Sequence, residues 1–322
     1  MKIPRAALAA LCLSLCWHAP ALAQAQYPDR PIRIVVGFTP GGGNDIIARV
    51  FGQKLSESLG QPVIIENKPG AGAMLATEYV ARSAPDGYTL LVGASGAMTI
   101  SPAVYEKMTY DTMRDFKPIS ELGSFPLILI VNAKSEFKSL ADLVAYTKAN
   151  PDKANYSSSS AAFQLATELF KQKTGAPMQM IPYKGANDSV TAVISGEVTA
   201  TIADAGPVIG QVNGGMARAL AVAAPTRAES LPDVPTMKEA GADVEAVLWS
   251  GIFVPAATPP EIVRKLEAEF IRIARLPDVV SRLKLLNIDS VGNSSEEFSR
   301  IIAGDLERWK AVARAGNIKM AQ

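Results

Sequence analysis

The stretch GFTPGGGNDIIARV, residues 37–50, decides the fold because it joins an apolar run to an amphipathic helix. The run before it, IRIVV at residues 32–36, has the β-branched composition of a buried strand. After the glycines, apolar side chains recur at spacings of three and four until Gly60, which predicts a helix. A glycine-rich turn between strand and helix leaves main-chain N–H groups uncovered, and such groups attract an anion.

The turn does not match the nucleotide-binding motifs that it superficially resembles. Gly43 and Asn44 stand where a P-loop requires lysine and a hydroxyl, and Ile46 stands at the third glycine of a dinucleotide turn. Two interpretations stay open at this point. The turn binds a small anion, or it is only a tight turn in which Asn44 or Asp45 caps the helix.

Similar turns follow other predicted strands, at residues 93–96 (GASG), 157–161 (SSSSA) and 204–207 (DAGP). Because the carboxyl ends of parallel strands meet at one edge of a sheet, these turns are expected to face a common crevice. Each of them is also explained by a polar loop with a helix cap. Asp204 either bonds a ligand amino group, orients water or ties down its own loop.

The pattern of strands and helices predicts an α/β protein with two lobes. Residues 32–94 show strand, helix, strand, helix, strand, and a second series of the same kind follows residue 132. Two extended runs, residues 126–132 and 247–256, border that series, so we expect the chain to cross to a second lobe and return through two hinge strands. The predicted lobes are residues 24–124 with 251–322, and residues 125–250.

The N-terminus carries the features of a secretory signal. Lys2 and Arg5 precede an apolar run, and Ala21-Leu22-Ala23 offers a cleavage site, which predicts a signal peptide at residues 1–23 and a periplasmic location. A lipoprotein signal ending at Cys16 is the alternative, and Leu15 disfavours it. No later run approaches the roughly 20 apolar residues of a membrane span, so no stable membrane insertion is expected.

Cleavage would also narrow the possible chemistry. It removes both cysteines, Cys12 and Cys16, and the single histidine, His18. A disulfide, a Cys or His metal site, a cysteine nucleophile and a Ser-His-Asp triad are thereby excluded, which leaves a serine-lysine or carboxylate pair for catalysis. The loss of Lys2 and Arg5 lowers the formal net charge of +1 by two, a balance that disfavours nucleic acid as a partner. We expect no metal and no cofactor.

Several segments together resemble the Bug family of extracytoplasmic solute receptors over essentially the whole mature chain. They are YPDRPIRIVVGFTPGGGNDIIAR at residue 27, VIIENKPGAG at 63, APDGYTLLVG at 84, LATELFK at 165, IPYKG at 181, ISGEV at 194, RALAVAAPTRAESLPDVPTMKEAG at 218 and GIFVPAATPPEIVRKL at 251. The resemblance implies a type II periplasmic-binding-protein fold with two hinge strands and a central cleft. It also implies a small carboxylate ligand (an organic, amino or aromatic acid), delivery to the permease of a tripartite tricarboxylate transporter, and no catalysis; we expect a monomer.

In this family a carboxylate is commonly held by main-chain amides and ordered water in the first strand-to-helix loop, with help from the serine loop. The four serines and Gln164 depart from many relatives, which often carry glycine and histidine there. The residues expected to bind the ligand are Phe38, Thr39, Pro40, Gly41, Gly42, Gly43, Asn44, Asp45, Ser95, Gly96, Ser157, Ser158, Ser159, Ser160, Ala161 and Asp204.

Two other functions share these features. An exported sensor would use the same pocket and report its closed state to a signalling partner. An exported enzyme acting on a carboxylic acid would need a catalytic pair, and no spaced serine-lysine motif supports one.

Overall fold

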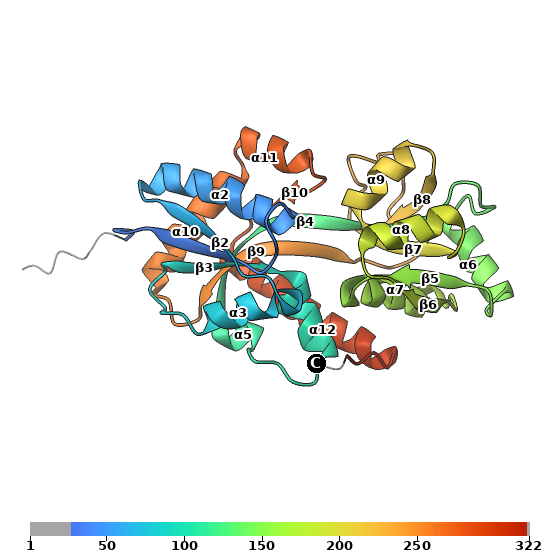
Figure 1. The fold of residues 1–322 in the computed structure, drawn as a ribbon, viewed down its shortest axis with the longest axis horizontal. Coiled ribbons are helices and arrows are strands. Elements are labelled where there is room, and N and C mark those ends of the chain that lie inside the picture. The colour runs from blue at the N-terminus through green and yellow to red at the C-terminus, as the bar shows by residue number, and fades with distance from the viewer. Residues whose placement is uncertain (1–26, 321–322) are drawn as a thin grey trace, which may run out of the picture.

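The computed structural model describes residues 27–320, which form two α/β lobes joined by two long strands (Figure 1). The predicted signal peptide, residues 1–23, and the alternative lipoprotein cysteine lie outside the described residues. Within residues 27–320, no helix has both the length and the apolar character needed to cross a membrane.

The first lobe is built on three parallel strands in the order β2-β1-β3, which confirms the predicted strand-helix alternation. Alternate side chains of β1 face opposite layers: Ile34 packs with helices α2 and α10, whereas Val35 packs with α3 and α12. The elements of this part are β1 (Ile32–Val36), α2 (Gly43–Leu59), β2 (Val63–Asn67), the short 3₁₀ turn η1 (Ala71–Ala73), α3 (Met74–Ala81), β3 (Thr89–Ala94), the π-helical turn η2 (Gly96–Ile100), α4 (Ser101–Val104) and α5 (Thr112–Asp115).

The second lobe repeats the arrangement, with β5 parallel to β6 and β7. Leu129 of the linking strand β4 packs with α6 and α7 on one face of the sheet, and Ile128 packs with α8 and α9 on the other. The elements are α6 (Leu140–Ala149), β5 (Asn155–Ser158), α7 (Ala161–Thr174), β6 (Gln179–Pro182), α8 (Ala186–Ser195), β7 (Ala200–Asp204), α9 (Ala205–Asn213) and β8 (Ala217–Val222).

Two antiparallel strands, β4 (Phe116–Asn132) and β9 (Val247–Pro255), run from one lobe to the other. They join the ten strands of residues 27–320 into one curled sheet, in which β4 pairs with β9 in the first lobe and with β7 and β8 in the second. The predicted lobe bounds fall at these two strands and stay a prediction. Strand β4 begins ten residues earlier than the predicted run at residues 126–132, because register shifts accommodate Pro118 and Gly123.

The last described elements are two long amphipathic helices, α10 (Pro260–Ala274) and α12 (Ser295–Ala315), separated by α11 (Pro277–Lys284) and the short strand β10 (Asp289–Ser290). Ser294 caps α12 by accepting a hydrogen bond from the Glu297 N–H at 3.1 Å. Helix α12 contacts both lobes, because Trp309 is buried with α7 of the second lobe and Gln172 Nε2 donates to the Val312 carbonyl at 3.1 Å.

Candidate functional site

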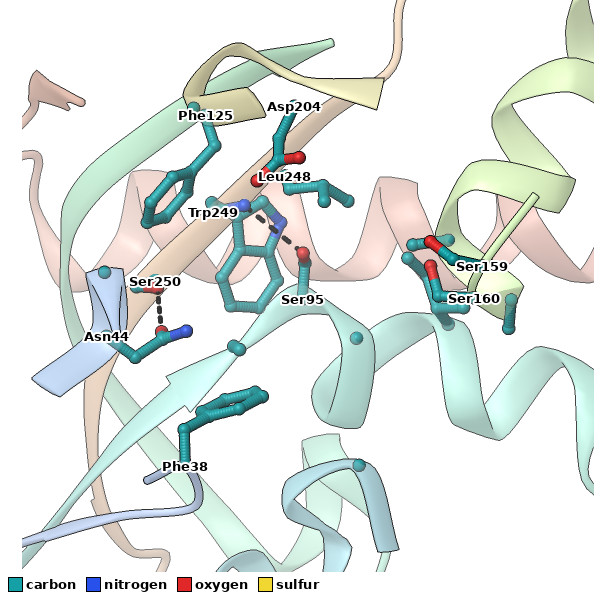
Figure 2. Close-up of a pocket in the computed structure, with 18 of the residues that line it drawn as sticks. Phe38, Asn44, Ser95, Phe125, Ser159, Ser160, Asp204, Leu248, Trp249 and Ser250 are labelled. Carbon is teal, nitrogen blue, oxygen red and sulfur yellow. Dashed lines mark hydrogen bonds between the residues drawn. The ribbon is translucent and has the colours of Figure 1, made fainter. Parts of the chain in front are cut away.

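A cavity of about 810 Å³ lies where the two lobes meet, at the carboxyl ends of β1, β3, β5 and β7. Figure 2 shows its walls, with Phe38, Asn44 and Ser95 from the first lobe, Ser159, Ser160 and Asp204 from the second, and Trp249 and Ser250 from the linking strand β9. The turns singled out in the sequence therefore do face one space, as the strand order predicted.

The loop after β1 presents free main-chain amides beside this cavity. Gly41 has a φ of 89°, a conformation that glycine adopts without steric cost, and Gly42 is the N-cap of α2. The first bond within the helix runs from the Ile46 N–H to the Gly42 carbonyl at 3.0 Å, so the N–H groups of Gly43, Asn44 and Asp45 have no partner in the helix. Neither Asn44 nor Asp45 caps the helix, in contrast to the expectation from sequence, because the chain enters α2 at Gly43.

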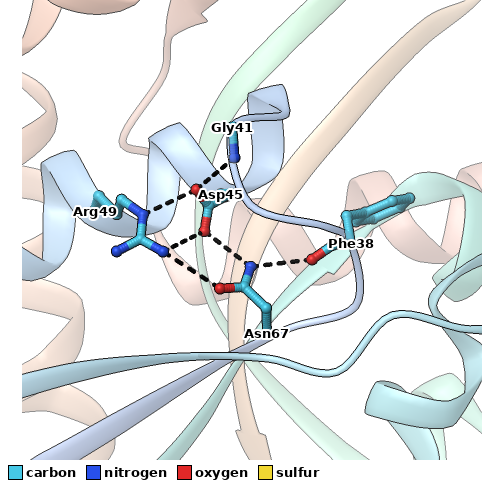
Figure 3. A network of polar contacts seen from close by, with 5 residues as sticks. All are labelled: Phe38, Gly41, Asp45, Arg49 and Asn67. Atoms are coloured by element: carbon cyan, nitrogen blue, oxygen red, sulfur yellow. Dashed lines mark hydrogen bonds and ion pairs between the residues drawn. The ribbon is translucent and has the colours of Figure 1, made fainter.

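Asp45 is not among the residues that line the cavity, and Figure 3 shows how its carboxylate links the two ends of the loop. Its carboxylate accepts hydrogen bonds from the Gly41 N–H at 2.9 Å, from Arg49 at 2.9 and 3.0 Å and from Asn67 Nδ2 at 2.8 Å. Asn67 Nδ2 also donates to the Phe38 carbonyl at 3.0 Å, which links both ends of the loop. Burial acts to raise the pKa of Asp45, but these hydrogen bonds outweigh it and lower the pKa.

Asn44 is the polar side chain of this loop that lines the cavity beside Phe38. Its Oδ1 accepts a hydrogen bond from the hydroxyl of Ser250, a fully buried residue of β9. The amide Nδ2 is thereby left as a donor, and it makes no hydrogen bond within residues 27–320. A side-chain donor thus stands beside the main-chain donors of the same loop.

The serine loop supplies the opposite wall, but its four hydroxyls play different parts. Ser157 donates to the Ser189 carbonyl at 3.0 Å inside the second lobe, and Ser158 donates to the Ser160 carbonyl at 3.1 Å. Ser160 caps α7 by accepting from the Phe163 N–H at 3.4 Å. Ser159 lines the cavity with a hydroxyl that has no hydrogen bond among the described residues.

The chain after β3 does not form the open turn that GASG suggested. It enters the π-helical turn η2 directly, and its Ser95 hydroxyl accepts a hydrogen bond from the Trp249 N–H at 3.2 Å. π-Helical turns are rare and are frequently found at functional sites. Trp249 lines the cavity, and its indole N–H donates to Asp305 at 2.8 Å in the hinge region.

Asp204 ends β7 and stands at the start of α9, with its carboxylate directed toward the cavity near Leu248. The Oδ1 atom is buried and has no hydrogen-bond partner, and the side chain does not cap α9. Burial raises the pKa of Asp204, and its own main-chain N–H opposes the rise. The side chain of Asp204 therefore makes no hydrogen bond to another described residue that would tie down its own loop.

Eleven of the sixteen predicted residues line the cavity, and five do not. Those outside are Thr39 and Pro40, which are exposed, Gly42 at the N-cap, and the structural residues Asp45 and Ser157. Lys184, which follows β6 in the second lobe, also lies outside the cavity lining. The lining residues are Phe38, Gly41, Gly43, Asn44, Ser95, Gly96, Ser158, Ser159, Ser160, Ala161 and Asp204.

Sequence reasoning missed several apolar and aromatic wall residues. Phe125 and Leu248 come from the two linking strands, and Tyr183 follows β6. The only available signal was their position within or next to the extended apolar runs, which does not say which side faces a ligand. Ala71 also lines the cavity, with a left-handed φ of 47° in the loop after β2.

In the described part of the chain, the cavity has a negatively charged side chain and no positively charged one in its lining, which is unusual for a site that attracts an anion. Among the described lining residues, Asp204 is the one charged side chain, and lysine, arginine and histidine are absent. The N-termini of α2, α7 and α9 open onto the cavity instead, and their partial positive charge favours an anion. Within residues 27–320, no group of three His, Cys, Asp or Glu residues is placed to hold a metal ion.

Comparison with known proteins gives consistent matches along the chain. Residues 47–318 match the family model described as tripartite tricarboxylate transporter family receptor, TctC. BugT of Bordetella pertussis is 35% identical over 298 residues, which cover 91% of each chain.

Two solved structures show the same fold. A Rhodopseudomonas palustris protein solved with adipate is 32% identical, with a TM-score of 0.77 over 91% of this chain and 99% of that one. MatC from R. palustris, solved with bound malate, is 29% identical, with a TM-score of 0.73 over 89% of this chain and 99% of that one. The expected fold and the resemblance to Bug receptors are confirmed, and the chain belongs to the tripartite tricarboxylate transporter receptor family.

Proposed function

We propose that this protein is a periplasmic receptor that binds a small carboxylate between its lobes and delivers it, as a monomer and without catalysis, to a tripartite transporter. The observation that carries the proposal is the convergence of the N-termini of α2, α7 and α9 on one cavity. Each helix end stabilises a nearby anion by about 0.3–1 kcal/mol, and by up to about 2 kcal/mol in partly buried geometry. Together they suit a carboxylate without a cationic side chain.

Hydrogen-bond donors without a partner among the described residues lie on both sides of the cavity. The free N–H groups of Gly43 and Asn44 and the Asn44 amide lie on one side, and the Ser159 hydroxyl lies on the other. Hydrogen bonds to a charged group contribute about 1.5–3 kcal/mol each. A ligand that bridges the two sides therefore draws the lobes together around the linking strands.

A binding role without catalysis is supported by the residues that surround the serine hydroxyls in the cavity. No lysine or histidine lines the cavity among the described residues, so Ser159 has no neighbouring base to activate it. The remaining carboxylate, Asp204, has no second carboxylate beside it in the lining. The relatives solved with adipate and malate point to small organic acids as the ligand class to test first.

A thermal-shift screen of dicarboxylates, tricarboxylates, amino acids and aromatic acids tests the proposal. A cognate ligand at 100 times its Kd stabilises the folded state by about 2.7 kcal/mol, which raises Tm by about 3–6 °C in a protein of this size. Stabilisation by neutral sugars or peptides, with none by any carboxylate, would overturn the proposal.

A pair of variants ties the effect to the loop after β1. Asn44→Asp places a negative charge beside the free amides, and we expect it to weaken binding of the stabilising acid at least tenfold. Asn187→Asp makes the same change on the exposed first turn of α8 and should leave the affinity unchanged. Equal affinities in the two variants would contradict the assignment of this loop.

A further inference from the structure

The cavity combines a wall that attracts an anion with one isolated carboxylate. Gly43 and Asn44 present their donors from the first lobe, whereas Asp204 belongs to the second lobe and stands apart from Asn44 in Figure 2. Leu248 and Trp249 lie beside Asp204, so its surroundings are largely apolar. The two polar parts are thus suited to opposite ends of a ligand.

The Asp204 carboxylate lacks the partners that a buried charge requires. Oδ1 is inaccessible and unpaired, and no cationic side chain lines the cavity within the described chain. A buried, unpaired carboxylate costs several kcal/mol unless it is protonated or finds a cation. Two other buried carboxylates near the cavity differ in this respect, because Asp45 bonds Arg49 and Asp305 bonds Arg308, while the buried Glu121 of β4 accepts a hydrogen bond from Asn293.

We propose that the ligand is an amino acid, with its carboxylate at the amides of the first lobe and its ammonium group at Asp204. The inference rests on the proposed function and narrows the ligand class. An ammonium group supplies the missing charge and donates a charge-assisted hydrogen bond, which is about twice as strong as a neutral one. A second carboxylate at the same place would be repelled by Asp204.

The carbon chain between the two ligand groups meets an apolar lining. Phe38, Phe125, Leu248 and Trp249 lie around the space between the amide loop and Asp204. Methylene groups are stabilised by leaving water for such an apolar lining. The cavity therefore distinguishes ligands chiefly by the chemical group that the ligand places next to Asp204.

Isothermal titration of the unmodified protein with matched probes tests this inference. The probes are the ω-amino acids of three to six carbons and the common α-amino acids, each beside the plain monocarboxylate and the dicarboxylate of equal carbon number. We expect the tightest ligand to be an amino acid, with an affinity at least tenfold above both matched acids. A dicarboxylate that binds more tightly than every amino acid would overturn the inference and leave the proposed function standing. If no acid of any class binds the folded protein, the proposed function itself fails.

A substitution then tests the role of Asp204. Asp204→Asn keeps the shape of the side chain and removes its charge, so the amino acid should lose at least tenfold in affinity while the dicarboxylate keeps or gains affinity. Asp289→Asn removes a charge outside the cavity and serves as the control. Unchanged affinity for the amino acid in Asp204→Asn would overturn the assignment, and the probe series on the unmodified protein decides the ligand class if the variant does not fold.

Discussion

At the scale of single residues, Asp45 is the side chain on which the shape of the anion-binding loop depends. It is buried, and its three partners come from the turn, from the next turn of α2 and from the end of β2. Asp45→Asn removes the charge from these hydrogen bonds, and we expect it to lower the free energy of unfolding by about 1–3 kcal/mol in urea at pH 7. Asp278→Asn, an exposed acid on α11, should cost less than about 1 kcal/mol.

The effect of Asp45 should depend on pH with a defined sign. Its folded-state pKa is lowered, so its contribution to stability is present above the unfolded value of about 3.9 and is lost as the pH falls through the folded value. The stability difference between the natural protein and Asp45→Asn should therefore shrink below about pH 4. A difference that stays constant down to pH 2 would show that the charge of Asp45 is not what matters.

Asp45 and Asp204 also show where sequence reasoning stops. Both lie in turns at the carboxyl ends of predicted strands, and both were predicted to contact the ligand. The two carboxylates differ in their hydrogen-bond partners. Arg49, one helical turn away, and Asn67, on another strand, donate hydrogen bonds to Asp45. No described side chain donates to Asp204. Contacts between segments far apart in the chain decide this, and no local pattern reports them.

At the scale of elements, β9 is packed too tightly against α12 to accept a larger residue at Gly251. A Cβ at this position would overlap the ring of Phe298 and lie 3.0 Å from the Ser120 carbonyl oxygen. Gly251→Ala should lower the free energy of unfolding by about 1–3 kcal/mol. Gly304→Ala, in α12 with no heavy atom within 4 Å of the added Cβ, should raise it by about 0.4–1 kcal/mol. Urea unfolding that gives both changes the same sign would contradict this packing.

Strand β4 buries a carboxyl group where the two lobes are linked. Burial raises the pKa of Glu121 to about 7, with Asp305 and Glu297 adding to the rise and the hydrogen bond from Asn293 opposing it. A raised carboxyl pKa means that the folded state holds a proton that the unfolded state has lost, so stability falls as pH rises from about 4.5 to 7.

Glu121→Gln should remove this dependence and stabilise the protein at pH 8 by on the order of 3 kcal/mol relative to its effect at pH 4.5. Chemical unfolding at a series of pH values measures the difference. Glu261→Gln, an exposed position in the first turn of α10, should show no such trend. Parallel pH profiles for the natural protein and Glu121→Gln would refute the burial of a neutral Glu121.

Helix α2 was predicted well because its apolar residues recur at helical spacing and Gly60 marks its end. Strand β4 was predicted only in its second half, because Pro118, Glu121 and Gly123 interrupt its apolar pattern. Pairing with β9, with two register shifts, keeps these residues in the sheet. The π-helical turn η2 was not predicted, since its start inside GASG carries no local signal that distinguishes it from a turn.

At the scale of the whole molecule, the two lobes are joined by more than the linking strands. Helix α12 packs Trp309 against the second lobe, which fixes one side of the junction (Figure 1). At another place, Lys284 of α11 forms an ion pair with Glu229, which follows β8 in the second lobe. Both side chains of this pair are exposed, so it contributes less than about 1 kcal/mol and does not lock the lobes together. A closing motion would therefore pivot on the α12 side.

The central claim is that main-chain amides at the start of α2 hold the carboxylate of the ligand, and a crystal structure with the tightest-binding acid tests it most directly. We predict carboxylate oxygens within about 3.2 Å of the N–H groups of Gly43 or Asn44, directly or through one ordered water. A carboxylate bound elsewhere, with those amides facing only solvent or protein, would contradict the account.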